Sequence, residues 1–127
     1  MWTVIPGKSI GPFSLGEVVS KYSEILSEQF SVFKRFPDSD EIYAYDNDGV
    51  YLTVDSERKI IQIAVFPPNE VYLGEIQLLK RELQELIIEL SAANVGFESI
   101  DSGLQSDELG IVLVEVAGRI DSVELGP

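Results

Sequence analysis

The chain lacks the two residue types that most often act as base and nucleophile, because it contains no histidine and no cysteine. Histidine is the commonest metal ligand and a frequent general base, and cysteine supplies the reactive thiolate. Serine–histidine and cysteine–histidine nucleophile systems and disulfides are therefore excluded. Any catalysis would have to use carboxylate, tyrosine, serine or lysine side chains, as in glycosidases or metal-dependent phosphoryl transfer.

Two pairs of nearby carboxylates could in principle act as acid and base: Asp38 with Asp40, and Asp107 with Glu108. A catalytic pair needs a defined separation across a cleft, with one carboxyl in apolar surroundings that raise its pKa. Adjacent acids in polar segments are usually solvated. A carboxylate-dependent hydrolase is therefore the third of three hypotheses.

The segment Asp46-Asn-Asp-Gly, followed by Asp55, resembles part of a calcium-binding loop. The EF-hand spacing would place its first ligand at Ala44, which has no side-chain oxygen, and its twelfth at an aspartate instead of a glutamate. Alternating apolar residues on both sides favour a hairpin turn. The sequence predicts no metal site here.

Glycines near the N-terminus could suggest a phosphate-binding loop, but neither G-x-x-x-x-G-K-[ST] nor G-x-G-x-x-G occurs. Turn geometry and close packing explain these glycines, which are Gly7, Gly11 and Gly16. We expect no cofactor.

The charge balance is strongly acidic, with 22 acidic and 9 basic residues and a formal net charge of −13. Such a surface repels nucleic acid and anionic membranes and attracts basic proteins. No apolar run approaches the ~20 residues of a membrane span, and the start of the chain does not resemble a secretory signal. These features predict a soluble, cytoplasmic, bacterial protein.

Acidic residues dominate the chain from Gly96 onward, where only Arg119 opposes them. Carboxylates in such a rim could bind lysine and arginine of a partner, and an exposed leucine could anchor the complex. The alternative is an ordinary solvated surface. The predicted partner-binding residues are Glu98, Asp101, Leu104, Asp107, Glu108, Asp121 and Glu124.

The sequence also predicts two helices. The first begins at Ser14, where Ser14 and Glu17 have capping-box spacing and Phe13 and Val18 have staple spacing, and it ends near Glu28. The second spans about 73–93 and has an apolar stripe with helical periodicity. Both helices are predicted to pack on an antiparallel sheet.

Alternating or continuously apolar runs predict the strands of that sheet. They are joined by polar turns, including Ala117-Gly118, and an acidic loop spans 101–108. The predicted strands are 2–5, 30–36, 41–45, 50–54, 60–66, 95–100, 110–115 and 120–124.

The chain also suggests an internal repeat, because Phe13-Ser-Leu-Gly-Glu-Val is similar to Val71-Tyr-Leu-Gly-Glu-Ile. Each motif precedes a predicted helix and hairpin. The prediction is a single α+β domain over residues 1–127, with a duplicated helix-plus-antiparallel-meander unit at about 13–66 and 71–125.

Two stretches, Ile5-Pro-Gly-Lys-Ser-Ile-Gly-Pro-Phe-Ser-Leu-Gly and Ile100-Asp-Ser-Gly-Leu-Gln-Ser-Asp-Glu-Leu-Gly-Ile, resemble small acidic bacterial immunity proteins encoded beside polymorphic or contact-dependent toxins. The helix-plus-meander repeat is similar to the architecture of the beta-lactamase inhibitory protein. Both resemblances imply binding instead of catalysis. Neither carries over a functional residue, because immunity proteins diversify their contact residues.

The leading hypothesis is therefore a non-enzymatic immunity-type protein that binds and neutralises a cognate, basic, nuclease-like toxin. The alternative is a small-ligand-binding or regulatory domain whose concave sheet face is lined by Tyr43, Tyr45, Tyr51 and Phe66. An exposed strand edge at 30–36 or at the C-terminus could pair two chains, and the oligomeric state stays open.

Overall fold

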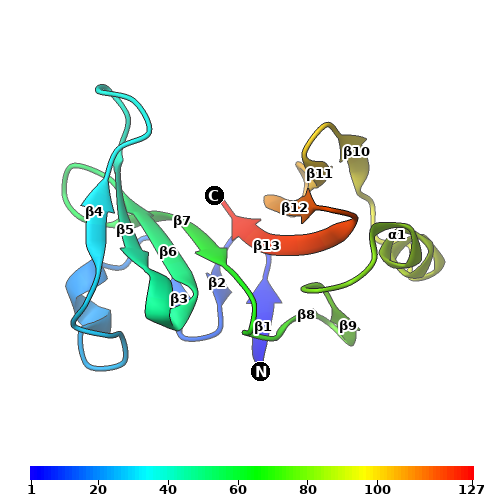
Figure 1. Ribbon diagram of the computed structural model, residues 1–127, viewed down its shortest axis with the longest axis horizontal. Coiled ribbons are helices and arrows are strands. Elements are labelled where there is room, and N and C mark those ends of the chain that lie inside the picture. Colours follow the sequence, from blue (N-terminus) through cyan, green and yellow to red (C-terminus); the bar gives the residue numbers. More distant parts are fainter.

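The computed structural model describes residues Met1–Pro127 and consists mainly of β-strands arranged in two sheets (Figure 1). The larger sheet has eight strands, all paired with antiparallel neighbours, in the order β10-β11-β12-β13-β7-β6-β5-β4. The smaller sheet has five short strands in the order β3-β2-β1-β8-β9, in which β1 and β8 run parallel.

The first half of the chain contains seven strands and two short 3₁₀ helices. They are β1 (Trp2–Ile5), β2 (Ser9–Ile10), β3 (Phe13–Ser14), η1 (Val19–Tyr22), β4 (Ser31–Phe33), β5 (Glu41–Tyr45), η2 (Asp46–Asp48), β6 (Val50–Val54) and β7 (Ile60–Val65).

The second half contains six strands and the single α-helix. They are β8 (Val71–Leu73), β9 (Ile76–Gln77), α1 (Leu83–Ala92), β10 (Glu98–Ile100), β11 (Gly103–Ser106), β12 (Ile111–Val116) and β13 (Arg119–Leu125). None of the helices is long and apolar enough to cross a bilayer.

The predicted α+β class with two helices packed on a sheet is wrong, because the first expected helix is absent. Phe13 and Ser14 form strand β3, and Gly16 has the left-handed backbone conformation (φ +86°), which an α-helix cannot contain. Ser14 donates its N–H to the Tyr22 hydroxyl at 2.9 Å, so the expected capping box does not form. Only the single 3₁₀ turn η1 remains.

The second predicted helix exists but begins at Leu83 instead of Leu73. The residues before it form the β8–β9 hairpin, with Gly74 at φ +61° in its turn. Glu82 caps the helix by accepting the N–H of Glu85 at 2.8 Å. The C-terminal part of the predicted apolar stripe lies on this helix, whereas its N-terminal part, Ile76 and Leu79, belongs to strand β9 and the turn before the helix.

Several strand predictions are confirmed. Strands β1, β5 and β6 have the predicted bounds, and the bounds of β7, β12 and β13 differ from the predicted ones by one residue at one or both ends. The polar segment 46–48 is the β5–β6 turn, and Ala117-Gly118 joins β12 to β13. The short strands β2, β3, β8 and β9 were missed, and β11 occupies part of the predicted acidic loop.

One hydrophobic core lies between the large sheet, the small sheet and α1. Leu52, Ile63 and Leu113 of the large sheet pack in the same buried cluster as Phe13 of the small sheet and Leu86 of α1. These elements therefore cover only one face of the large sheet, which we call its inner face. Its other face is the outer face.

The two halves of the chain share detailed backbone features around the central β7–β13 pair. A register shift occurs between Thr53 and Val54 against β7, and another between Val114 and Glu115 against β13. An isolated bridge joins Val18 to Lys59 in the first half and Glu82 to Arg119 in the second. Corresponding elements therefore include η1 and α1, β5 and β11, and β6 and β12.

The Leu-Gly-Glu motifs do not occupy corresponding positions in the two halves. Gly16 donates its N–H to the Ile60 carbonyl at 2.8 Å, and the matching bond runs from Lys80 to Ile120 at 2.9 Å. Gly74 instead lies in the β8–β9 turn, where Gly11 lies in the β2–β3 turn. The structural counterpart of Gly16 is therefore Lys80, and the predicted equivalence of residues 15–17 with 73–75 is wrong.

Candidate functional site

Exposed apolar side chains gather in one segment of the chain, residues 25–36. Five of the ten exposed large hydrophobic residues lie there, and Phe36 is 70% exposed. They are Ile25, Phe30, Val32, Phe33 and Phe36. We call the part of the molecule around β4 and these residues the aromatic end. Exposed apolar side chains gathered around an edge strand in this way are typical of a protein–protein interaction site.

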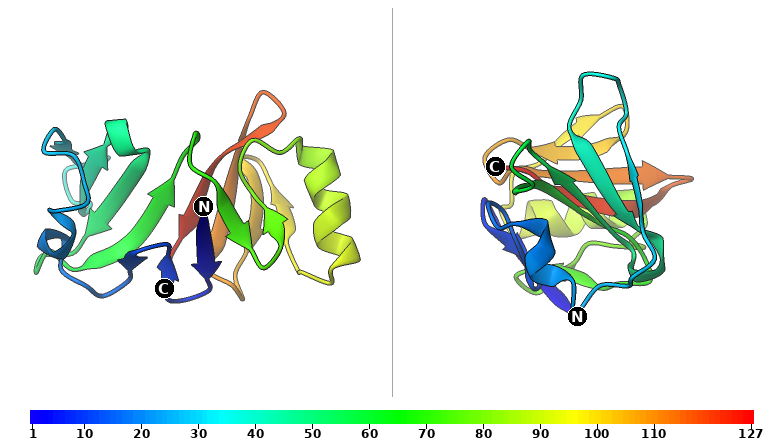
Figure 2. Two further views of the ribbon diagram at one scale, coloured as in Figure 1. Left: turned by 90° about the horizontal axis from the view of Figure 1, so that it is seen from below. Right: turned by 90° about the vertical axis from the view of Figure 1, so that its left-hand side faces the viewer.

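Strand β4 presents these side chains because it is the edge strand of the large sheet. It pairs only with β5, and all three of its residues are exposed. Successive strand residues point to opposite faces. Phe33, opposite Ile42, lies on the outer face, and Val32, opposite Tyr43, lies on the inner face. The loop that follows, 34–40, projects beyond the rest of the sheet (Figure 2).

On the outer face, Phe33, Tyr51 and Phe66 form an aromatic row. Phe33 and Tyr51 meet edge to face with their centroids 6.2 Å apart, and Tyr51 and Phe66 are 4.8 Å apart. The Tyr51 hydroxyl donates to Asp46 Oδ1 at 2.6 Å, and this bond raises the pKa of Tyr51. The row is therefore held in place before any partner arrives.

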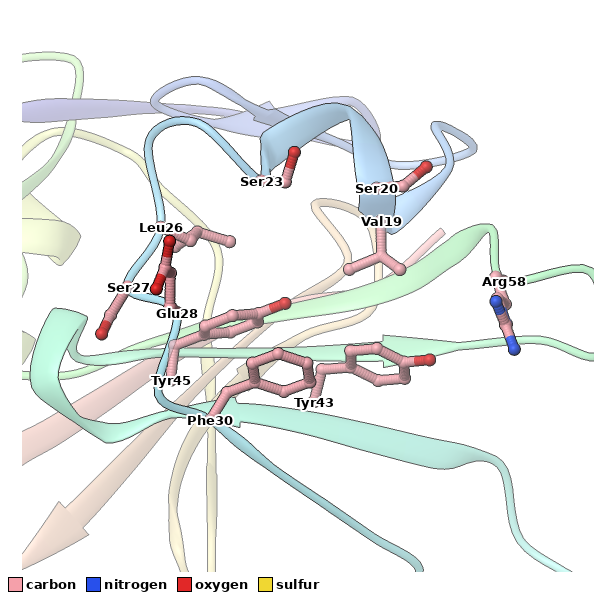
Figure 3. A pocket seen from close by; sticks show the side chains of 10 residues that line it. All are labelled: Val19, Ser20, Ser23, Leu26, Ser27, Glu28, Phe30, Tyr43, Tyr45 and Arg58. Atoms are coloured by element: carbon pink, nitrogen blue, oxygen red, sulfur yellow. The ribbon is translucent and has the colours of Figure 1, made fainter.

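On the inner face, Phe30 stacks on two tyrosines of β5. Its ring lies 5.6 Å from Tyr43 and 4.9 Å from Tyr45, with interplanar angles of 12° and 28°. These rings line a pocket of about 670 Å³ between β5 and the segment that contains η1 (Figure 3). Burial, with smaller effects of Tyr43 and Asp48, raises the pKa of Tyr45.

Acidic side chains surround the aromatic end, and none of them is in an ion pair. The three ion pairs of the molecule are Lys21–Glu17, Lys59–Glu57 and Arg81–Glu89. The acids near the aromatic end are Glu24, Glu28, Asp38, Asp40, Glu41, Asp46 and Asp48. Lys34 and Arg35 of the projecting loop lie among them, and Arg58 lines the pocket beside Phe30.

The predicted acidic rim lies at the other end of the large sheet and is divided into two groups. Glu98 pairs with Gln105, which pairs with Val112, and Val112 pairs with Glu124, so these four share a row on the outer face. Asp107 and Glu108 follow in the β11–β12 turn beside this row.

Asp101 and Asp121 lie at the opposite end of these strands, near the β12–β13 turn. The prediction that Leu104 is an exposed anchor is wrong. Leu104 is 2% exposed and packs in the core, because its partner in the β11–β12 pair is the buried Leu113.

Glu124 differs from the other rim acids because it is partly buried in the middle of the sheet, between Ala64 and Val112. Burial raises the pKa of its carboxyl, and the positive charge of Arg35 opposes this shift. Arg35 belongs to the projecting loop, so this loop influences the electrostatics of the outer face.

The alternative sites from the sequence are not assembled as predicted. Tyr43 and Tyr45 lie on the inner face, whereas Tyr51 lies on the outer face, so these residues do not line one concave surface. Asp38, Asp40, Asp107 and Glu108 are all exposed. No group of three or more acidic side chains is arranged to hold a metal ion.

Sequence reasoning missed the aromatic end as the main candidate site, although one signal was present. Phe30, Val32, Phe33 and Phe36 place apolar side chains on both faces of a predicted strand. In a strand bounded by polar turns, this pattern indicates either full burial or an apolar edge. The long polar segment after Phe36 favours the edge.

Comparison with known proteins adds no family or relative: no family model matches the chain, and no curated protein or solved structure shows significant similarity to it.

Proposed function

We propose that the chain is an immunity-type protein of the cytoplasm, which binds and neutralises a basic, nuclease-like protein toxin without catalysing a reaction itself. The observation that carries this proposal is the exposed aromatic edge around β4. Phe33 and Phe36 offer apolar area that the chain does not bury itself. Buried aromatic side chains are the most frequent hot spots of protein interfaces.

Charge supports a basic partner. The formal charge of −13 and the unpaired acids around the aromatic end attract a positively charged protein and accelerate its capture. In a complex with a basic nuclease, the carboxylates of this chain would bind the lysine and arginine residues that otherwise bind the phosphates of nucleic acid. The partner's active site would then be blocked by competition.

The rigidity of the aromatic row supports tight binding. Tyr51 is fixed between Phe33 and Phe66 and by its bond to Asp46, so little side-chain entropy is lost when a partner covers it. Because Phe33 and Tyr51 lie on strands and Phe66 directly follows β7 and donates its N–H to the Gly49 carbonyl, the geometry of the row persists in the free protein. Preorganisation of this kind lowers the dissociation rate.

Co-expression with the product of the adjacent gene, which the proposal expects to be a toxin, tests the proposal. The wild-type chain should bind the toxin domain and protect the cells. The double variant Phe33→Ser/Phe36→Ser should lose both properties. The control variant Ile88→Ser changes a side chain on the distant helix α1 that is as exposed as Phe36, at 70%, and it should keep both. Binding without protection, or no binding, contradicts the proposal.

A second candidate function is small-ligand binding in a regulatory domain. The inner pocket favours it, because about 670 Å³ lies within the range of small-molecule sites. A screen of metabolites by thermal shift would test it. A compound that raises the melting temperature of the wild type but not of a Tyr45→Ala variant would support this function over the first.

A further inference from the structure

We propose that the inner pocket beside β5 is a receptor for the guanidinium group of an arginine side chain. The proposed function supplies the source of that arginine, which is the basic partner. The chemistry of the pocket stands independently of the partner and can be tested with a small arginine derivative.

The pocket is open only in the first half of the chain, because the corresponding hollow in the second half is nearly filled. The corresponding hollow between α1, β10 and β11 has only about 50 Å³. Since Val19 and Leu83 are the first helical residues of the two halves, Ser23 corresponds to Ile87. Ile87 lines and fills the closed hollow, whereas Ser23 leaves the open pocket unfilled.

Other corresponding positions line the walls of both hollows. Phe30 and Phe97 each precede the outermost strand of their meander, and both line their hollow. Tyr43, paired with Leu52, corresponds to Leu104, paired with Leu113. The first half therefore combines a shortened helix with Ser23 and Tyr43 at positions where the second half has a full helix with Ile87 and Leu104.

The pocket is lined in layers that suit a flat cation. Phe30, Tyr43 and Tyr45 form an aromatic floor, and Val19 and Leu26 lie above it (Figure 3). A guanidinium group is planar and weakly hydrated and stacks on aromatic rings, where the cation–π attraction favours it. A slot with an aromatic floor and an apolar roof accepts such a group with little loss of solvation.

Polar groups at the edge of the slot suit the five N–H donors of a guanidinium. Glu28 can accept two parallel N–H bonds, and Ser20, Ser23 and Ser27 also line the slot. Glu28 has no ion-pair partner of its own in the free protein. A lysine ammonium is compact and strongly hydrated, so it would gain less from the flat rings.

The two ends of the pocket carry opposite charges. Arg58 lines the end opposite to Glu28 (Figure 3), and its positive charge disfavours a second cation there. The guanidinium is therefore expected at the Glu28 end. Replacing Arg58 with glutamine should tighten the binding of a cation, whereas removing Glu28 should weaken it.

Titration of the ¹⁵N-labelled protein with Nα-acetyl-arginine amide, followed by NMR, tests the proposal. Amide shifts should concentrate at residues 19–30 and 43–45. The neutral citrulline analogue should bind at least about tenfold more weakly, because it lacks the charge-assisted bonds. The lysine analogue should also bind more weakly than arginine.

Two variants and one control complete the test. Ser23→Ile, which copies the closed half, should abolish the arginine shifts, and Glu28→Gln should weaken them about tenfold. Ser56→Ile introduces the same side chain in the exposed β6–β7 turn and should have no effect. A spectrum with wild-type dispersion confirms that each variant is folded.

The outcomes separate this proposal from the proposed function. Equal binding of arginine and citrulline derivatives, or no shifts around the pocket, overturns the guanidinium site. The proposed function survives that result if the toxin still binds through Phe33 and Phe36. Conversely, arginine binding that Ser23→Ile removes supports the pocket even where the neighbouring toxin does not bind.

Discussion

Glu124 places a carboxylate in the middle of the large sheet, where burial raises its pKa and Arg35 lowers it. Burial has the larger effect, so the carboxyl of Glu124 binds its proton more tightly in the folded chain than in the unfolded chain. Stability falls as the pH rises from the ordinary carboxyl range through the raised pKa. At neutral pH the charged group destabilises the fold.

We expect Glu124→Gln to be more stable than the wild type at pH 7, because it removes a partly buried charge. The advantage should shrink as the pH falls, since the wild-type carboxyl then becomes neutral. Urea unfolding at pH 7 and pH 4 measures the difference. Glu108→Gln is an exposed control and should show no such trend. A variant less stable at pH 7 would mean that the attraction of Arg35 outweighs burial.

A substitution at Leu104 tests whether this residue belongs to the core or anchors an interface. Its side chain is 2% exposed and belongs to the main core. Leu104→Ala should therefore lower the free energy of unfolding by about 2–4 kcal/mol. Chemical denaturation would measure this. A loss well below 1 kcal/mol would return Leu104 to the surface role that the sequence suggested.

At the scale of elements, the residue that lies three positions before the first helical residue has the same backbone conformation in both halves but a different side chain. Gly16 and Lys80 both have left-handed backbone conformations, with φ of +86° and +63°, just before a helix. A Cβ at Gly16 would meet no atom within 4 Å, so only the backbone conformation limits substitution there.

Exchanging these residues should have opposite effects on stability. Gly16→Lys should cost about 1–2 kcal/mol, because a left-handed conformation is unfavourable for a residue with a Cβ. Lys80→Gly relieves the same strain and should be neutral or stabilising by up to about 1 kcal/mol. Thermal unfolding of both variants checks the signs. Destabilisation by Lys80→Gly would show that its side chain has a structural role.

These connections explain why the strands were easier to predict than the helices. Alternation over five residues identified β5 and β6 with their observed bounds. The capping pattern at Ser14 and Glu17 is local, and the pairing of Phe13 with Ile10 overrides it. A two-residue strand has no periodicity, so its presence depends on contacts that only the folded chain provides.

The candidate site was partly readable for a similar reason. The acidic composition is visible directly in the sequence, which also predicts an exposed strand edge at 30–36. The closed and open hollows could not be foreseen, because they depend on which residues of η1 and α1 correspond. That correspondence requires the isolated bridges at Val18 and Glu82, which no sequence pattern reveals.

At the scale of the whole molecule, charge and apolar surface are expected to act on different rates. Association with a basic partner should slow markedly as the ionic strength rises to physiological values, where the screening length is about 8 Å. Dissociation should change less. Surface plasmon resonance over a salt series would separate the two rates. An association rate that is independent of salt would contradict a role for the acidic surface.

We expect the aromatic end, and not the acidic rim, to hold the partner. The most direct test compares dissociation rates of the toxin complex for two multiple variants. One is Phe33→Ser/Phe36→Ser, and the other is Asp101→Asn/Asp107→Asn/Glu108→Gln, which removes three rim charges.

The aromatic variant should dissociate at least about 100-fold faster, because hot-spot aromatic residues each contribute about 2 kcal/mol or more. The rim variant should dissociate at nearly the wild-type rate and differ only in a slower association. Rapid dissociation of the rim variant, together with a wild-type rate for the aromatic variant, would contradict this expectation and place the interface on strands β10 to β13.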